Sequence, residues 1–257
     1  MNLQTILNCS DTDTISLPDL PRTLEILYCY NTKITIIPTL PQSLRELFCD
    51  NTEITSLPIL PQSLKTLNCY NNQIISLPSL PQSLEILDCS DTKIIYLSIL
   101  PQSLRELYCD NTKITSLPTL PQSLKRLYCY NTCITSLPAL PQSLKELYCF
   151  NTKITTIPAL PQSLTILDCS NTQIMTVPAL PQSLEILNCN NCKYLYIPKK
   201  SRARRFVNET EYNINYNYQV LKIQRVYKKF KQRKFQKTLY ANSDLPKDVC
   251  YCISKMI

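Results

Sequence analysis

Cysteine is the residue whose number and spacing could carry chemistry in this chain. The 257 residues include 14 cysteines and no histidine. Thiolates can bind zinc, but zinc sites use Cys-x-x-Cys pairs, and Cys189 with Cys192 forms the only such pair. A free thiol otherwise packs as a small apolar side chain. We therefore predict core filling, with no metal or other cofactor, for the ten cysteines that recur every twenty residues: Cys9, Cys29, Cys49, Cys69, Cys89, Cys109, Cys129, Cys149, Cys169 and Cys189.

The common devices of catalysis are also missing from the composition. With no glycine the chain cannot build a glycine-rich phosphate loop, and with no histidine it has no imidazole base. No pair of carboxylates recurs in a plausible cleft. We predict a protein that is not an enzyme and has no small-molecule substrate.

The elements that position the cysteines repeat with the same period. Each unit, such as residues 104–123, follows L-x-x-L-x-C-x-N-T-x-I-x-x-L-P-x-L-P-x-S, and no unit carries an insertion or deletion. The Leu-Pro steps remove backbone donors and hold φ near the polyproline value, so this part of the unit should be extended and not helical. The leucines, the Ile and the Cys can bury themselves only against neighbouring units, which predicts one continuous core.

This pattern resembles the leucine-rich repeat over residues 3 to about 198. The resemblance implies a solenoid of about ten units, with one parallel β-sheet on the concave face and an extended, polyproline-like convex side. The short unit is similar to repeats of secreted bacterial effectors, and the composition resembles repeat proteins of giant viruses.

The unit departs from the family at the third residue after the ladder cysteine. In the family this residue is an Asn whose side chain binds the backbone of the coils before and after it. Only Asn72 keeps it, and units such as those of Thr32 and Thr112 carry Thr, whose hydroxyl can do part of the work. The residue before it, such as Asn31, tolerates the turn conformation that glycine would otherwise supply.

The concave face is predicted from the alternation of strand side chains, which places the residues on either side of each cysteine on the open sheet. A cluster of exposed aromatic side chains is typical of a protein-binding surface. The alternative is that the aromatics only cover the sheet by pairing across strands. The aromatic residues at these positions are Tyr28, Phe48, Tyr108, Tyr128 and Tyr148 before the cysteine, and Tyr30, Tyr70, Tyr130 and Phe150 after it.

Charge divides the chain in two. Residues 1–198 contain 12 Lys and Arg against 15 Asp and Glu, a net −3, whereas residues 199–257 contain 15 against 4, a net +11. We expect a solenoid domain (1–198), a basic and polar linker (199–217), a basic amphipathic helix (218–241) and a tail (242–257). No run of eighteen apolar residues and no signal-peptide pattern is present, which predicts an intracellular, cytoplasmic protein. The basic run Lys199–Arg205 resembles a nuclear-import signal, which leaves a nuclear location as the alternative.

The predicted helix carries apolar residues at intervals of three and four, among them Val226 and Tyr227. Its sequence resembles the IQ motif, with Lys229 in place of the motif's glycine. The resemblance implies binding of a calmodulin-like EF-hand protein. The residues that would make the contacts are Ile223, Gln224, Lys228, Phe230 and Arg233. The alternatives are a cap on the last coil of the solenoid, or contact with an anionic membrane or a nucleic acid.

These features predict a scaffold or adaptor that binds one protein on the concave tyrosines and a calmodulin-like protein through the basic helix. The competing class, implied by the resemblance to effectors, acts on host ubiquitin pathways through a catalytic cysteine, for which Cys250 and Cys252 are the candidates. Only 59 residues follow the repeats, which is far shorter than such a ligase domain.

Overall fold

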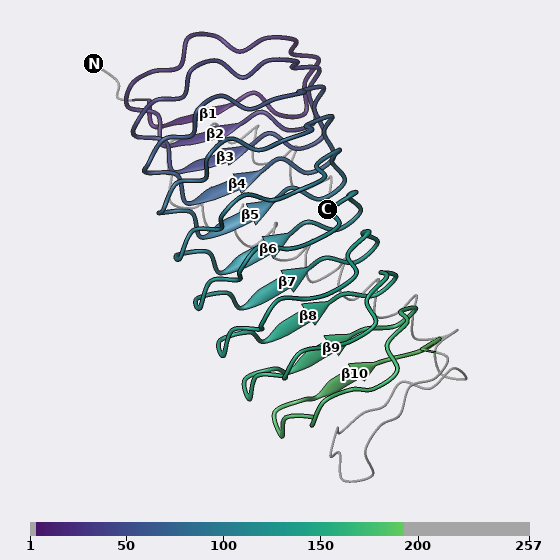
Figure 1. The fold of residues 1–257 in the computed structure, drawn as a ribbon. Helices are drawn as coiled ribbons and strands as arrows, with labels where there is room; N and C mark the ends of the chain where they lie inside the picture. The colour runs from purple at the N-terminus through teal and green to yellow at the C-terminus, as the bar shows by residue number, and fades with distance from the viewer. Residues whose placement is uncertain (1–3, 193–257) are drawn as a thin grey trace, which may run out of the picture. The chain divides into compact units, whose positions relative to one another are not determined.

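The computed structural model describes residues 4–192, which form a stack of coils with one strand in each coil (Figure 1). The ten strands pair in sequence order, and every pair is parallel. Their register is constant, because each strand residue lies opposite the residue twenty positions later, as Leu107 does with Leu127. The strands are β1 (Ile6–Asn8), β2 (Ile26–Tyr28), β3 (Glu46–Phe48), β4 (Thr66–Asn68), β5 (Ile86–Asp88), β6 (Glu106–Tyr108), β7 (Arg126–Tyr128), β8 (Glu146–Tyr148), β9 (Ile166–Asp168) and β10 (Ile186–Asn188).

The core runs without a break through the coils, as predicted. In the coil of β6, the side chains of Leu104, Leu107, Cys109 and Ile114 are wholly buried, and Leu120 is almost so. The same positions of the neighbouring coils belong to the same apolar cluster. Since each coil packs only against the next, stability depends on contacts between neighbours.

A sharp turn follows each strand and uses Asn or Asp where many proteins use glycine. Asn31, Asn111 and their equivalents have φ between 51° and 57°, in the left-handed region. Asn and Asp tolerate this region better than other non-glycine residues. The prediction that these residues replace glycine is confirmed. The adjacent Thr hydroxyl donates to the carbonyl of the ladder cysteine, at 2.7 Å for Thr112 and Cys109.

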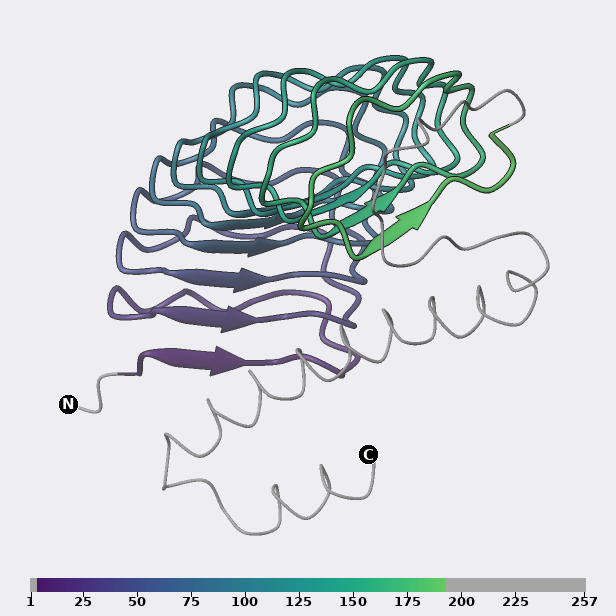
Figure 2. The ribbon, with the colours of Figure 1, turned by 90° about the horizontal axis from the view of Figure 1, so that it is seen from below.

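The wall opposite the sheet is irregular. Figure 2 shows the strands along one side of the stack and the remaining segments along the other. In residues 4–192 this wall contains no helix, in agreement with the extended convex side that the prolines predict. The same residues include no helix with the length and hydropathy of a membrane span.

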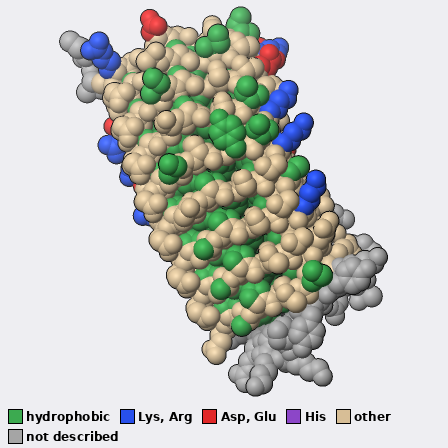
Figure 3. Space-filling view, in the orientation of Figure 1, with side chains coloured by type: hydrophobic (Ala, Val, Ile, Leu, Met, Phe, Trp, Pro, Cys, Tyr) green, Lys and Arg blue, Asp and Glu red, His purple; other side chains and the backbone are tan. Residues whose placement is uncertain are grey.

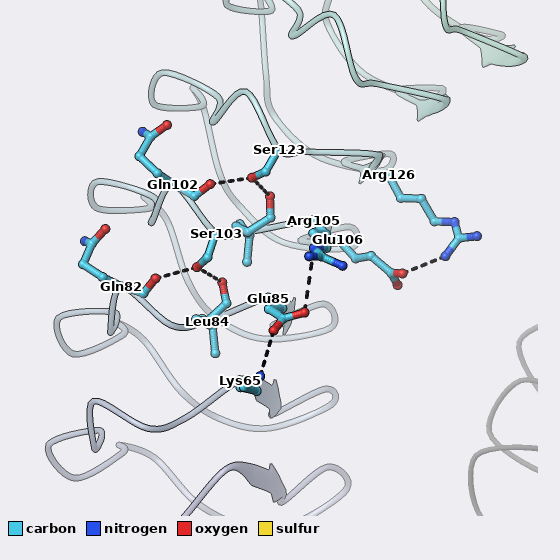
Figure 4. A network of polar contacts seen from close by, with 11 residues as sticks. Lys65, Gln82, Leu84, Glu85, Gln102, Ser103, Arg105, Glu106, Ser123 and Arg126 are labelled. Carbon is cyan, nitrogen blue, oxygen red and sulfur yellow. Dashed lines mark hydrogen bonds and ion pairs between the residues drawn. The ribbon is translucent and has the colours of Figure 1, made fainter. Parts of the chain in front are cut away.

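Serine hydroxyls tie the irregular wall of each coil to the coil before it. The Ser103 Oγ donates to the carbonyl oxygens of Gln82 and Leu84, both at 2.6 Å, and Ser123 repeats the contact with Gln102 and Leu104 (Figure 4). Beside them, Glu85 lies between Lys65 at 3.3 Å and Arg105 at 3.8 Å.

The irregular wall carries no charged residue over most of its width. In the coil of β6 the uncharged segment runs from Ile114 to Ser123, and the corresponding segments of the other coils, from residues 34–43 to residues 174–183, are also uncharged. Figure 3 shows that wall, with the charged side chains along its edges.

Candidate functional site

The outward side of the sheet, which we call the sheet face, gathers the side chains that the alternation rule placed there. The strand register sets Tyr28, Phe48, Asn68, Asp88, Tyr108, Tyr128 and Tyr148 in one row. A neighbouring row follows the ladder cysteines and contains Tyr30, Asp50, Tyr70, Ser90, Asp110, Tyr130 and Phe150. A third row precedes the central leucines and contains Glu46, Glu106, Arg126 and Glu146. Both aromatic rows are therefore interrupted by polar residues, at Asn68 and Asp88 in the first row and at Asp50, Ser90 and Asp110 in the second.

The aromatic rings of β6, β7 and β8 stack into a ladder. The Tyr108 and Tyr128 centroids are 4.8 Å apart, and those of Tyr128 and Tyr148 are 4.5 Å apart. In the next row Tyr130 and Phe150 stack at 4.3 Å with nearly parallel rings. At the other end of the sheet, Tyr28 stacks on Phe48 at 5.1 Å and meets Tyr30 edge to face. The aromatic residues that the sequence placed on this face thus lie in contact with one another in the coils of β6, β7 and β8.

The exposure of these rings is smaller than the sequence analysis expected. Tyr148 is 6% exposed and Tyr28 9%, so both are buried. The other seven, Phe48 and Tyr108 among them, are half-buried. The reason is that rings one strand apart cover each other's faces, which leaves their edges to solvent. The sheet face offers aromatic edges and hydroxyls more than open ring faces.

Charged side chains bind the tyrosines of the ladder. The aromatic pattern of the sequence did not reveal these charged residues. The Arg126 guanidinium lies between two carboxylates. Its Nη1 is 2.7 Å from Glu106, a contact that Figure 4 shows, and its Nε is 3.1 Å from Glu146. The Tyr108 hydroxyl donates to Glu106 at 2.8 Å, and the Tyr128 hydroxyl donates to Glu146 at 2.9 Å. Since these residues occupy alternate strand positions, the rule that found the tyrosines could also have found them.

Carboxylates replace aromatic side chains at two positions of the aromatic rows, Asp88 and Asp110. We call these two residues the acidic section. Asp88 is the last residue of β5, and Asp110 lies two residues beyond β6. Both are 5% exposed. Burial, and secondarily the negative charge of Asp88, raise the pKa of the Asp110 carboxyl to about 7. A hydrogen bond from the Tyr130 hydroxyl acts in the opposite direction.

The ladder cysteines occupy the core, as predicted. Cys29 and the seven ladder cysteines that follow it up to Cys169 are wholly buried, and all ten are free thiols. Burial raises the pKa of their thiols, so they are poor nucleophiles. Cys192 differs, because hydrogen bonds from Cys169 and Thr172 lower its pKa to about 6. Within residues 4–192, no three His, Cys, Asp or Glu side chains are arranged to hold a metal ion.

The basic linker, the IQ-like helix with Ile223, Gln224, Lys228, Phe230 and Arg233, and the candidate cysteines Cys250 and Cys252 lie outside the described residues. Predictions about them are tested neither by the fold nor by the geometry of the sheet face.

Comparisons with known proteins agree with this architecture. A family model described as leucine rich repeats, in two copies, matches residues 122–162. No curated protein sequence matches the chain.

Solved structures give the more extensive match. YopM from Yersinia enterocolitica WA-314 is similar, with 33% identity, a TM-score of 0.73, and coverage of 78% of this chain and 45% of that one. The present chain therefore spans less than half of that protein. YopM from Yersinia pestis, described as a leucine-rich effector protein, has 27% identity, a TM-score of 0.53, and coverage of 79% and 76%. A domain of InlJ from Listeria monocytogenes, which includes a cysteine ladder, shares the fold at 22% identity, a TM-score of 0.54, and coverage of 76% and 55%.

Proposed function

Because the chain is a leucine-rich-repeat protein built from twenty-residue units, we propose that it is a non-enzymatic scaffold that binds a protein on its sheet face and a calmodulin-like protein through residues 218–241. Leucine-rich-repeat solenoids generally serve as protein-binding scaffolds. The observation that supports protein binding on the sheet face is the ladder of Tyr108, Tyr128 and Tyr148. Tyrosine offers a large and rigid contact area with a polar tip, a composition that protein interfaces favour.

The location of the charges supports the same face. The irregular wall has no charged residue over most of its width, whereas the sheet face carries both tyrosines and the Glu106–Arg126–Glu146 network. Aromatic anchors surrounded by polar groups are the usual anatomy of a protein interface. The tyrosine rings also pair across strands, which is the alternative role considered for them in the sequence analysis. This pairing would hold the tyrosine side chains rigid before a partner binds.

A binding assay on sheet-face variants tests this proposal. The tagged full chain would be used to capture its partner from the organism's own extract, and the purified partner would then be titrated. We expect Tyr128→Ala/Tyr130→Ala to weaken binding by about a hundredfold, because both side chains are central and ordered. Thr115→Ala/Thr119→Ala, at exposed positions of the irregular wall, should change the affinity less than about twofold. Equal losses in both variants would contradict the assignment to the sheet face.

The proposed binding of a calmodulin-like protein rests on the IQ-like sequence of residues 218–241 and on its basic, amphipathic pattern. Such helices are a usual target of calmodulin, which encloses an apolar stripe flanked by basic residues. Calorimetric titration of the full chain with calmodulin should give saturable binding, in calcium or in chelator. Ile223→Ala/Gln224→Ala should abolish it, while Asn208→Ala/Thr210→Ala, outside the motif, should retain it. Absence of binding in both conditions would remove calmodulin from the proposal.

We place this scaffold inside the cell, in the cytoplasm. The free state of all twelve cysteines among residues 4–192 fits a reducing compartment. The likeness to YopM supports an effector-like protein, and action on host ubiquitin pathways remains the alternative reading of that likeness.

A further inference from the structure

The three rows of the sheet face carry mostly negative charge. They contain seven carboxylates and one guanidinium, namely Glu46, Asp50, Asp88, Glu106, Asp110, Glu146 and Asp168 with Arg126, while Arg45, Lys65, Arg105, Lys125 and Lys145 come directly before the strands. The opposite wall contributes nothing to this imbalance, because it is uncharged from Ile114 to Ser123 and in the corresponding segments of seven other coils. The two rows beside the ladder cysteines contain Asp50, Asp88, Asp110 and Asp168 and no Lys or Arg, so a partner that reaches these rows meets negative charge, which favours positively charged groups.

Carboxylates of the sheet face already bind one cationic side chain, that of Arg126. Arg126 lies in β7, and its guanidinium bridges Glu106 of β6 and Glu146 of β8 at 2.7 and 3.1 Å. Both carboxylates also accept hydrogen bonds from tyrosine hydroxyls, at 2.8 and 2.9 Å. A guanidinium, two carboxylates one strand away on either side, and an adjacent tyrosine ladder thus form a stable arrangement here. Charge-assisted bonds of this kind are the stronger ones among protein hydrogen bonds.

The acidic section also places two carboxylates near aromatic residues, here in two different rows. Asp88 and Asp110 belong to neighbouring coils, and the charge of Asp88 contributes to the raised pKa of Asp110. A cation between them would cancel this repulsion. In the two rows, Phe48 and Tyr108 lie on either side of Asn68 and Asp88, and Tyr70 and Tyr130 lie on either side of Ser90 and Asp110. Each aromatic pair spans three strand spacings, about 14 Å, so aromatic rings flank the carboxylates on both sides.

We propose that the protein bound by the sheet face presents a lysine- and arginine-rich segment, with a cationic side chain between Asp88 and Asp110. This inference deepens the proposed scaffold function and rests on it. The aromatic ladder supplies the apolar contact area, and the carboxylates select the charge of the partner.

The test uses the full chain and a labelled synthetic peptide of alternating Lys and Ser, with a Glu-for-Lys peptide as the charge control. Fluorescence anisotropy should show saturable binding of the Lys peptide alone. Asp88→Asn/Asp110→Asn should weaken it by about tenfold or more. Glu53→Gln/Glu185→Gln removes the same charge at two exposed positions and should change the affinity less than about twofold. Binding should also release protons near pH 7, because a nearby cation lowers the pKa of Asp110.

Three outcomes would overturn the proposal. No saturable binding of the Lys peptide, or an equal loss in both double variants, would show that the acidic section does not select cations. Binding that appears only after Lys228→Glu/Lys229→Glu/Lys231→Glu would mean that the chain's own basic segment is the occupant and not a partner. If the peptide fails while Tyr128→Ala/Tyr130→Ala still loses the captured protein, the scaffold function stands and only the cationic class of partner is wrong.

Discussion

Replacing Asn72 with alanine is expected to lower the free energy of unfolding by about 3 to 5 kcal/mol, since each buried polar group left without a partner costs about 1–3 kcal/mol. Asn72 is 1% exposed. Its amide donates to the carbonyl oxygens of Cys49 at 2.9 Å and Cys69 at 3.0 Å, and its carbonyl accepts from the Thr52 hydroxyl at 2.7 Å and the Thr52 amide at 3.2 Å. Alanine would remove all of these partners and leave a cavity.

Asn72→Thr is the matched control. Every coil from Thr32 to Thr172 other than that of Asn72 carries Thr at this position, and its hydroxyl donates to the cysteine of the same coil, as Thr132 does to Cys129 at 2.7 Å. Threonine should therefore restore one of the lost hydrogen bonds and reduce the loss to about 1–2 kcal/mol. Urea unfolding followed by circular dichroism measures both variants. An alanine variant within about 1 kcal/mol of the unmodified chain would show that the bridge between coils is dispensable.

The second large effect concerns Asp110 and pH. Burial and Asp88 raise its pKa to about 7 in the folded chain, whereas an Asp in an unfolded chain titrates near 3.9. Because the folded form holds the proton more tightly, its contribution to stability is present below pH 4 and is lost as pH rises towards 7. Asp110→Asn removes the charge, so at pH 8 it should be more stable than the unmodified chain by about 2–4 kcal/mol, and at pH 4 the two should be similar.

Denaturation midpoints at pH 4 and pH 8 measure this difference. Asp13→Asn serves as the opposite control, because Lys33 lowers the pKa of the exposed Asp13 carboxyl by a hydrogen bond and by its charge. Removing that carboxylate should leave the stability at pH 8 unchanged or slightly lower. A less stable Asp110→Asn variant at pH 8 would mean that the hydrogen bond from Tyr130 outweighs burial.

Much of this molecule could be predicted from its sequence, because the repeat admits no insertion. The period of twenty determines the register, so the opposition of Leu107 and Leu127 follows from counting. The glycine-free turns also had a local signal, since Asn and Asp occupy the left-handed position in every coil. The face on which Tyr128 lies follows from strand alternation.

Other features depend on three-dimensional surroundings that counting does not supply. The low exposure of Tyr148 results from stacking on Tyr128, and ring stacking depends on side-chain angles. The raised pKa of Asp110 depends on the burial of its carboxyl group, which cannot be calculated from the repeat period. The hydrogen bonds of Arg126 to Glu106 and Glu146 also needed the structure, although their strand positions could have been found by alternation.

The constant register makes the coils interchangeable at the level of the gene. Removing residues 84–103, for example, would join Ser83 to Leu104, the same Ser-Leu step that joins Ser83 to Leu84. The strand pairing, the serine contacts and the core could then form again between the new neighbours. Deletion or duplication of one whole repeat can thus shorten or lengthen the sheet by one strand without disturbing the pairing of the others. The distance between the aromatic pair of Tyr28 and Phe48 and the tyrosine ladder that begins at Tyr108 becomes a quantity that copy number alone can adjust.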